Sequence, residues 1–371
     1  MASTRQFIFA GGGTGGHIYP AIAVAQQLVQ IEPKTSIHFF CSERAIDSQI
    51  LQTTPFDFSV LPAQGLSLSP VKLIGFLRKF FNSAKTAKSH LKLHNQPVVV
   101  GAGGFVSSPV CWAAHKLNIP IALINVDIVP GKANKLNTRW AQDVFIHFQD
   151  TYNYFSRYKT KVHVTGCPLR KEFNNPHAEQ ARKQLNLDPD KNTLLITGAS
   201  SGCKSINDTI TALLPQLSMY KETWQIVHLT GTRNFAEIKQ NSADSNLKYT
   251  VLPYYDNMAD LLACADLLIG RSGAVSVAEY AVSGVPSICI PYPHHKDQHQ
   301  YRNAGKLVEA GAAIMVDDLP DFTDRTQWLW EELEPLLKDD AMRKTMAKAC
   351  SIAAKPNAGR KIAEYLLQKN Y

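Results

Sequence analysis

Two glycine-rich segments, each placed between a short apolar run and a helical segment, constrain the fold of this chain most. The first follows Gln6–Ala10 and has the sequence GGGTGGH over residues 11–17. The second follows Thr193–Thr197 and has the sequence GASSG over residues 198–202. A strand that ends in glycines and leads into a helix is typical of a nucleotide-binding βαβ unit. The repetition predicts an α/β protein with two similar units.

Short apolar runs alternate with helical segments in both halves, which indicates parallel sheets covered on both faces. A chain of 371 residues is also longer than one hydrophobic core usually spans. We therefore expect two Rossmann-like domains, at residues 1–165 and 166–345. Residues 346–371 should hold a C-terminal helix that packs back on the first domain. The further predicted strands are Ser36–Cys41, Pro97–Gly101, Ile121–Ile124, Ile226–Leu229, Tyr249–Leu252, Leu267–Gly270 and Ser287–Pro291.

Ligands of open α/β sheets bind at the carboxyl ends of the strands, where these glycine loops lie. The first loop contains G-x-G-x-x-G, and Glu43 ends the next strand, as in an NAD-dependent oxidoreductase. Two further glycine loops, at Gly101–Phe105 and 198–202, disfavour that alternative because they allow one ligand to be held from two domains. His17 closes the first loop at a helix start, and histidine is the commonest general acid or base, so His17 is a catalytic candidate.

The net charge of +8 is concentrated in the first half of the chain, where no acidic residue occurs between Asp57 and Asp127. Residues 70–81 combine large apolar side chains with cations, which favours contact with an anionic membrane surface. The helical spacing of the apolar residues equally fits the core face of a helix. No recognised nucleic-acid motif accompanies the charge. The residues expected to face the membrane are Lys72, Leu73, Ile74, Phe76, Leu77, Arg78, Lys79 and Phe80.

The seven cysteines are scattered and none lies in a CxxC pair, so neither a disulfide framework nor a metal site is expected. No apolar run reaches the length of a membrane span, and the N-terminus lacks the pattern of a secretory signal. We expect a cytoplasmic protein.

The glycine loops and the segment after the fourth strand of the second half resemble those of the MurG family of GT-B glycosyltransferases. The first and last of five segments are specific together, and the resemblance covers most of the chain. The five segments are GGGTGGHIYPAIAVA (Gly11–Ala25), GAGGFVSSP (Gly101–Pro109), TGCPLR (Thr165–Arg170), TGASSG (Thr197–Gly202) and RSGAVSVAEYAVSGVPSICIPYPHHKDQHQYRNA (Arg271–Ala304).

The resemblance implies two Rossmann-like domains facing across a cleft. It implies inverting transfer of N-acetylglucosamine from UDP-N-acetylglucosamine to undecaprenyl-diphospho-N-acetylmuramoyl-pentapeptide in peptidoglycan synthesis. No cofactor and no metal would be required, and the enzyme would act at the cytoplasmic face of the inner membrane. Its partners would be the UDP-sugar, the lipid-linked acceptor and anionic lipid, with other proteins of cell-wall synthesis left open.

The resemblance also assigns roles to individual residues. Glu279 resembles the acid that binds the ribose hydroxyls, Arg170 the arginine that offsets pyrophosphate charge, and His299 with Gln300 the pair that reads the donor sugar. His17 or Asp127 would be the base, and Gly103, Gly104, Asn125 and Asn134 would lie on the acceptor side. The remaining donor-binding residues would be Thr14, Gly15, Gly16, Ser200, Ser201, Tyr255, Met258, Ala274, Val275 and Ser276.

One segment departs from the family pattern. Members usually carry His-Glu-Gln-Asn after the fifth strand, whereas this chain has Ile124-Asn125-Val126-Asp127. Asn125 cannot act as a base, and an acid appears two positions later at Asp127. The departure leaves three alternatives open: a related GT-B enzyme with another lipid acceptor, a UDP-sugar epimerase, and a non-catalytic scaffold that binds a UDP-sugar.

Overall fold

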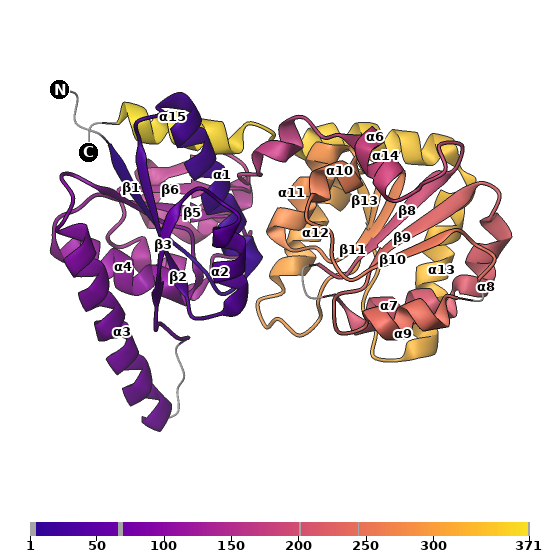
Figure 1. Ribbon diagram of the computed structural model, residues 1–371, viewed down its shortest axis with the longest axis horizontal. Helices are drawn as coiled ribbons and strands as arrows, with labels where there is room; N and C mark the ends of the chain where they lie inside the picture. The colour runs from indigo at the N-terminus through magenta and orange to yellow at the C-terminus, as the bar shows by residue number, and fades with distance from the viewer. Residues whose placement is uncertain (1–4, 66–69, 200–201, 244, 370–371) are drawn as a thin grey trace. The chain divides into compact units, whose positions relative to one another are not determined.

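The computed structural model describes residues 5–65, 70–199, 202–243 and 245–369 (Figure 1). The chain forms two compact units. The first unit comprises Met1–Arg170 together with Lys355–Tyr371, and the second unit comprises Lys171–Ala354. The chain therefore leaves the first unit after Arg170 and returns to it at Lys355, whereas the sequence placed the divisions after residues 165 and 345.

The first unit is built on a seven-stranded parallel sheet in the order β3-β2-β1-β4-β5-β6-β7. The strand order reverses between β1 and β4, where Ala10 lies opposite Gly101. The two glycine loops of this unit therefore leave the same edge of the sheet side by side, at the switch point where α/β sheets bind ligands. The strands are β1 (Gln6–Ala10), β2 (Ser36–Ser42), β3 (Asp57–Leu61), β4 (Val98–Gly101), β5 (Ile121–Asn125), β6 (Asp143–Ile146) and β7 (Val162–Val164).

The second unit has a six-stranded parallel sheet in the order β10-β9-β8-β11-β12-β13. Here the order reverses between β8 and β11, and Thr197 lies opposite Gly270. The loops that follow these two strands are again neighbours at one edge. The strands are β8 (Asn192–Thr197), β9 (Trp224–Leu229), β10 (Tyr249–Leu252), β11 (Leu267–Gly270), β12 (Ser287–Cys289) and β13 (Ala313–Met315).

Helices cover both sheets (Figure 1). The central strands are continuous apolar runs because both of their faces are covered, as in VVVG at β4 and LLIG at β11, in which every residue is buried. The prediction of two Rossmann-like parallel sheets is confirmed. The helices of the first unit are α1 (Gly15–Ile31), α2 (Ala45–Gln52), α3 (Pro70–Leu91), α4 (Gly104–Lys116), α5 (Lys132–Asn137), the 3-10 segment η1 (Gln149–Lys161) and α15 (Ala358–Gln368). Those of the second unit are η2 (Lys171–Asn174), α6 (Ala178–Gln184), α7 (Lys204–Ala212), α8 (Leu214–Leu217), η3 (Ser218–Tyr220), α9 (Phe235–Asn241), α10 (Met258–Leu262), α11 (Ala274–Ser283), α12 (His299–Glu309), α13 (Phe322–Lys338) and α14 (Asp340–Ala353).

The last helix, α15, packs along α1 of the first unit (Figure 1). Its end is tied to the buried Asp143 of β6: the Tyr365 hydroxyl donates to this carboxylate over 2.7 Å, and Lys369 is ion-paired with it. His163 of β7 contacts the same carboxylate at 2.9 Å. Burial alone would raise the pKa of Asp143, but the hydrogen bonds from His163, Lys369 and Tyr365 lower it to about 2. These contacts fix α15 to the edge of the first sheet.

From residue 73 onward, where the side chains of α3 are described, the buried ones begin at Ser83, in the C-terminal half of the helix. In Figure 1 its N-terminal half extends beyond the sheet and the other helices of the first unit. Leu73, Ile74, Leu77 and Phe81 are 38%, 71%, 44% and 53% exposed. The interpretation of Leu73 and Leu77 as part of a core face is therefore wrong, because both side chains are exposed, whereas Phe80 is half-buried against Trp112 of α4. The Lys72 side chain lies outside the described part of the structure. Within the described residues, no helix has the length and apolar character needed to cross a membrane.

Candidate functional site

A buried aspartate that the sequence analysis missed holds the first glycine loop. The carboxylate of Asp47, on α2, accepts hydrogen bonds from the Gly13 amide at 2.8 Å and from the Ser42 amide at 3.1 Å. The Ser42 hydroxyl donates to the same oxygen. A Cβ atom on Gly12 would lie 2.4 Å from this oxygen, so only glycine fits at that position. Asp47 therefore clamps the loop against the end of β2.

The two glycine loops of the first unit fit into one another. Gly104 has φ +72°, and a Cβ atom there would lie 2.2 Å from the Gly12 carbonyl oxygen. Gly103 has φ +95°, and its Cβ atom would lie 2.8 Å from the His17 ring. Both glycines thus have a left-handed backbone and no room for a side chain. Their packing sets the position of the His17 imidazole.

His17 lies at a small pocket of about 40 Å³ in the first unit. The two predicted catalytic residues and the four predicted acceptor-side residues all line it. These are His17, Asp127, Gly103, Gly104, Asn125 and Asn134. The Thr14 hydroxyl oxygen lies 3.2 Å from His17 Nδ1, so this pair orients the ring. The structure therefore brings together residues that are far apart in the sequence, around one histidine.

Asn125 is part of the framework of this pocket. It is buried, and its side-chain amide donates to the main-chain oxygen of Asp127 over 2.7 Å. The Asn134 amide donates to the Asn125 side-chain oxygen at 3.1 Å and to the Ile124 carbonyl at 3.0 Å. The substituted segment is thus held by two asparagines in a fixed turn, with the partly exposed Asp127 at its end.

The second unit has a larger pocket of about 660 Å³ at the carboxyl edge of its sheet. The loops after β8, β11, β12 and β13 contribute to its walls, together with the starts of α7 and α11. The pocket contains three cationic side chains and one carboxylate, which favours an anionic ligand. Its lining comprises Gly198, Ala199, Gly202, Cys203, Lys204, Ser205, Arg271, Gly273, Ser276, Tyr292, Pro293, His294, Gln300, Asp318, Leu319, Pro320 and Arg325.

Two helices begin at this pocket without a side-chain cap. Gly273 precedes α11 and Cys203 precedes α7, and neither caps its helix through a side-chain hydrogen bond. The first amides of a helix have no partner within the helix, and the helix dipole adds positive potential there. Such termini bind phosphate groups. The predicted residues Ala274, Val275 and Ser276 form the first turn of α11, and Ser276 lines the pocket.

Several other predicted donor residues have partners in the second unit. Gln300 lines the pocket, where its side-chain oxygen accepts from the Tyr292 amide at 3.0 Å. His299 Nδ1 contacts the Asp297 carboxylate at 2.7 Å. Neither His299 nor Glu279, which lies on α11, is among the residues that line the pocket.

The other predicted donor residues lie away from this pocket or outside the described residues. The Tyr255 hydroxyl donates to Gln184 at 3.2 Å, and Met258 begins α10. The Arg170 guanidinium lies 4.4 Å from the Tyr19 ring centre, within the first unit, although the sequence placed Arg170 in the second domain. Thr14, Gly15 and Gly16 also belong to the first unit, while Ser200 and Ser201 lie outside the described residues. The roles predicted for all of these residues stay predictions.

Two family models match the chain. Residues 7–146 match the N-terminal domain of glycosyltransferase family 28, and residues 193–362 match its C-terminal domain. The chain is 35% identical over 369 residues to the UDP-N-acetylglucosamine–N-acetylmuramyl-(pentapeptide) pyrophosphoryl-undecaprenol N-acetylglucosamine transferase of Desulfitobacterium hafniense, covering 97% of this chain and 98% of that protein. It is 34% identical to the transferase of the same name from Oenococcus oeni, covering 98% and 97%.

Solved structures agree with this relationship. The crystal structure of Acinetobacter baumannii MurG superposes with a TM-score of 0.76 at 25% identity, covering 99% of this chain and 100% of that one. The UDP-GlcNAc 2-epimerase of Neisseria meningitidis, at 17% identity and a TM-score of 0.70, covers 98% of this chain and shares the fold. The predicted GT-B fold is confirmed. The family resemblance read from the glycine loops is confirmed as well: the chain belongs to the MurG family within glycosyltransferase family 28.

Proposed function

We propose that this chain transfers N-acetylglucosamine from UDP-N-acetylglucosamine to undecaprenyl-diphospho-N-acetylmuramoyl-pentapeptide. The observation that carries the proposal is the single pocket that His17, Asp127 and the two asparagines line together. A histidine that is oriented by a hydroxyl group, in a pocket that an aspartate also lines, suits removal of a proton from an acceptor hydroxyl. The relatives that match the whole chain are named for this transfer.

The pocket of the second unit suits the diphosphate of the donor. The first amides of α7 and α11 would donate hydrogen bonds to phosphate oxygens, and the cationic lining would offset their charge. The same contacts would stabilise the UDP that leaves, whose negative charge grows as the glycosidic bond breaks. In this proposal Glu279 binds the ribose hydroxyls, and Gln300 with His299 reads the sugar.

His17 is the proposed base. If its Nδ1–H donates to the Thr14 hydroxyl, Nε2 is the basic nitrogen. Nε2 takes the proton of the acceptor hydroxyl while that oxygen attacks the anomeric carbon from the side opposite to UDP. The new glycosidic bond forms as the bond to the diphosphate breaks, so the configuration inverts. Asp127, which lines the same pocket, would stabilise the imidazolium that results. A separate positive charge develops on the donor sugar, whose transition state is oxocarbenium-like.

Transfer of labelled N-acetylglucosamine to a short-chain lipid-diphosphate muramoyl-peptide acceptor tests the proposal. We expect the wild-type protein to transfer the label. His17→Ala should lower kcat by a factor of about 100 or more, because loss of a general base typically costs that much. Glu279→Ala should instead raise the KM for the donor. A wild-type protein that binds UDP-N-acetylglucosamine but does not transfer to this acceptor would contradict the proposal and favour another acceptor.

The exposed half of α3 is the proposed membrane contact. Its four exposed apolar side chains lie in a segment whose charged residues are all basic, which suits the interface of an anionic bilayer. Docking here would place the enzyme at the cytoplasmic face of the inner membrane, beside its lipid-linked acceptor.

A vesicle-binding measurement tests the membrane contact. Ile74→Glu and Phe81→Glu should each lower binding to vesicles that contain anionic phosphatidylglycerol by a factor of about 5 or more. Each replaces apolar area that membrane binding would bury with a charge of the same sign as the lipid. Leu93→Glu is the matched control, because Leu93 is 78% exposed but lies beyond the C-terminal end of α3. Transfer to a short-chain soluble acceptor should be unchanged in all three variants. Equal loss of vesicle binding in Leu93→Glu would mean that α3 is not the contact.

A further inference from the structure

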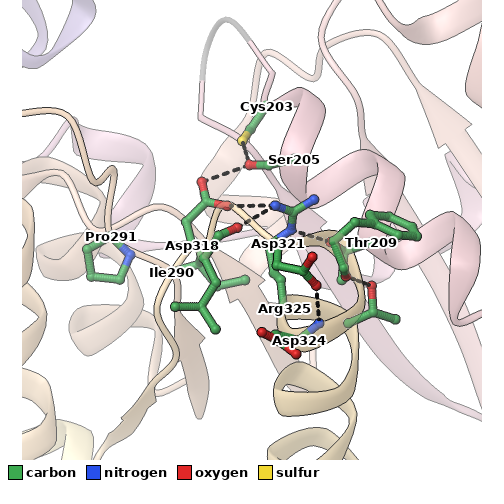
Figure 2. Close-up of polar contacts among 12 residues, drawn as sticks. Cys203, Ser205, Thr209, Ile290, Pro291, Asp318, Asp321, Asp324 and Arg325 are labelled. Carbon is green, nitrogen blue, oxygen red and sulfur yellow. Dashed lines mark hydrogen bonds and ion pairs between the residues drawn. The ribbon is translucent and has the colours of Figure 1, made fainter.

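One carboxylate joins several walls of the second unit's pocket. Asp318 follows β13, and its side chain is 7% exposed. One of its oxygens accepts from the Arg271 guanidinium at 2.6 Å and from the Ser205 hydroxyl at 2.8 Å. Its other oxygen lies 3.8 Å from the Arg325 guanidinium. Figure 2 shows Asp318 between Ser205 on one side and Arg325 on the other.

The Arg271 guanidinium is already engaged on both of its terminal nitrogens. Nη1 donates to the carbonyl oxygens of Ile290 and Pro291, each at 3.0 Å. Nη2 donates to Asp318, and it also lies 2.8 Å from the Cys203 sulfur and 3.3 Å from the Ser205 hydroxyl. A diphosphate could take a hydrogen bond from these nitrogens only by displacing a protein partner. Arg271 is therefore placed as a brace within the pocket wall.

The brace connects segments that are distant in the sequence. Arg271 follows β11, Ile290 follows β12, Ser205 lies in the first turn of α7 and Asp318 follows β13. Arg325, on α13, donates a hydrogen bond to the Leu319 carbonyl oxygen at 2.6 Å. Arg271 and Asp318 both contact Ser205 at the uncapped start of α7. The amides suited to phosphate are found at this helix start. The geometry of this helix start thus depends on contacts that meet at Asp318.

We propose that Asp318 is a positioning residue for donor binding, which acts by fixing Arg271 and the start of α7 rather than by touching the donor. The inference rests on the proposed function only in taking a UDP-sugar as the ligand of this pocket. Two guanidinium groups share one carboxylate, so the pair of arginines keeps a net positive charge while Asp318 prevents their mutual repulsion. Without this carboxylate, the buried Arg271 would lose the ion pair that it makes within the described residues, and the pocket wall would shift to hydrate it.

The test compares Asp318→Asn with Asp321→Asn. Asp321 is in the same loop, accepts from the Asp324 amide as the N-cap of α13, and does not line the pocket (Figure 2). Asparagine also caps helices well, so this control removes the same charge without removing the cap. The readouts are the Kd for UDP by titration calorimetry and the kinetic constants for UDP-N-acetylglucosamine and for the acceptor.

We expect Asp318→Asn to raise both the Kd for UDP and the donor KM by a factor of about 10, the usual cost of disturbing a charged hydrogen bond. The acceptor KM should stay unchanged, whereas general loss of folded protein would lower kcat alone. Asp321→Asn should behave as the wild type. Ser205→Ala, which removes one contact with Asp318, should raise the Kd for UDP by a factor of about 3. If Asp318→Asn does not fold, the Kd of this second variant tests the positioning role.

The outcomes separate the inference from the proposed function. If the wild type binds UDP and both aspartate variants bind it equally well, the positioning role is wrong and the proposed function stands. If Ser205→Ala and Asp318→Asn change the acceptor KM as much as the donor KM, the effect is not specific to the donor, and the inference is again overturned. If the wild type does not bind UDP, both the inference and the proposed donor are wrong. Transfer failure in a wild type that binds UDP leaves the inference testable by the Kd alone.

Discussion

Gly104→Ala is expected to abolish measurable transfer, because no side chain fits where the two glycine loops of the first unit meet. The new Cβ atom would lie 2.2 Å from the Gly12 carbonyl oxygen, which belongs to the backbone and cannot rotate away. The left-handed φ of +72° adds about 1–2 kcal/mol for a residue with a side chain. We expect the free energy of unfolding to fall by about 3 kcal/mol or more, the range for overpacking together with backbone strain. Urea unfolding and the transfer assay measure both effects.

Gly131→Ala is the matched control. Gly131 lines the same pocket as His17, but its φ is −62° and a Cβ atom there would meet nothing within 4 Å. Alanine should therefore leave transfer unchanged and change the free energy of unfolding by less than about 1 kcal/mol, because its restriction of the unfolded chain is offset by a poorer N-cap for α5. Wild-type activity in Gly104→Ala would show that the two loops do not need this close approach.

The free energy of unfolding is expected to fall steeply as the pH decreases below about 6.5, because two buried histidines are neutral in the folded protein. Burial lowers the pKa of His228 to about 3, and burial followed by the nearby charge of Lys355 lowers that of His147 to about 3. Below pH 6.5 the unfolded chain binds protons that the folded protein does not, so each histidine reduces stability until the pH falls through its folded pKa. At pH 5 the loss should be about 2 kcal/mol for each histidine.

His228 offers the clearer test, since its partners require the neutral ring. Its Nε2 donates to the Asn207 side-chain oxygen at 3.0 Å, and the Tyr249 hydroxyl donates to Nδ1. Protonation of Nδ1 would remove this acceptor. Urea unfolding at pH 7 and pH 5 should show a smaller pH dependence in His228→Gln than in the wild type, whatever its stability at pH 7. His294→Gln, at an exposed position, should keep the wild-type dependence. An unchanged dependence in His228→Gln would contradict the assignment.

The sequence predicted the parts of this fold whose signal is local. The glycine loops, the apolar strands before them and the helices after them each lie within about twenty consecutive residues, so their pattern can be read directly. Four strands were missed: β3, β6, β7 and β13. Of these, β6 has four buried residues, like the predicted β11, and the other three are short or partly exposed. β7 and β13 have three residues each, and β3 contains an exposed valine, Val60. Such strands are formed by pairing with a neighbour in the sheet, which no local pattern reports.

The same distinction applies to the sites. His17 follows a glycine loop and could be found from the sequence, whereas Asp47 contacts that loop from a position 34 residues away on another helix. Asp318 likewise meets Arg271 across 47 residues. In a sequence, these two buried aspartates cannot be told from acidic residues on the surface. They differ from those residues only in their burial, which the sequence does not report. The one local hint for Asp47 is that it follows closely on Ser42, at a strand end where ligands and loops meet.

The discontinuous make-up of the first unit has a consequence for how the protein must be synthesised. Helix α15 is placed in the first unit beside α1, yet the ribosome makes all of Lys171–Ala354 before it. The second unit can fold as soon as its continuous segment has emerged. The first must wait with one flank of α1 and the carboxylate of Asp143 uncovered until the last residues appear. A nascent chain that is halted before Ala358 would thus carry the whole continuous segment of the second unit, together with a first unit that lacks the helix packed along α1.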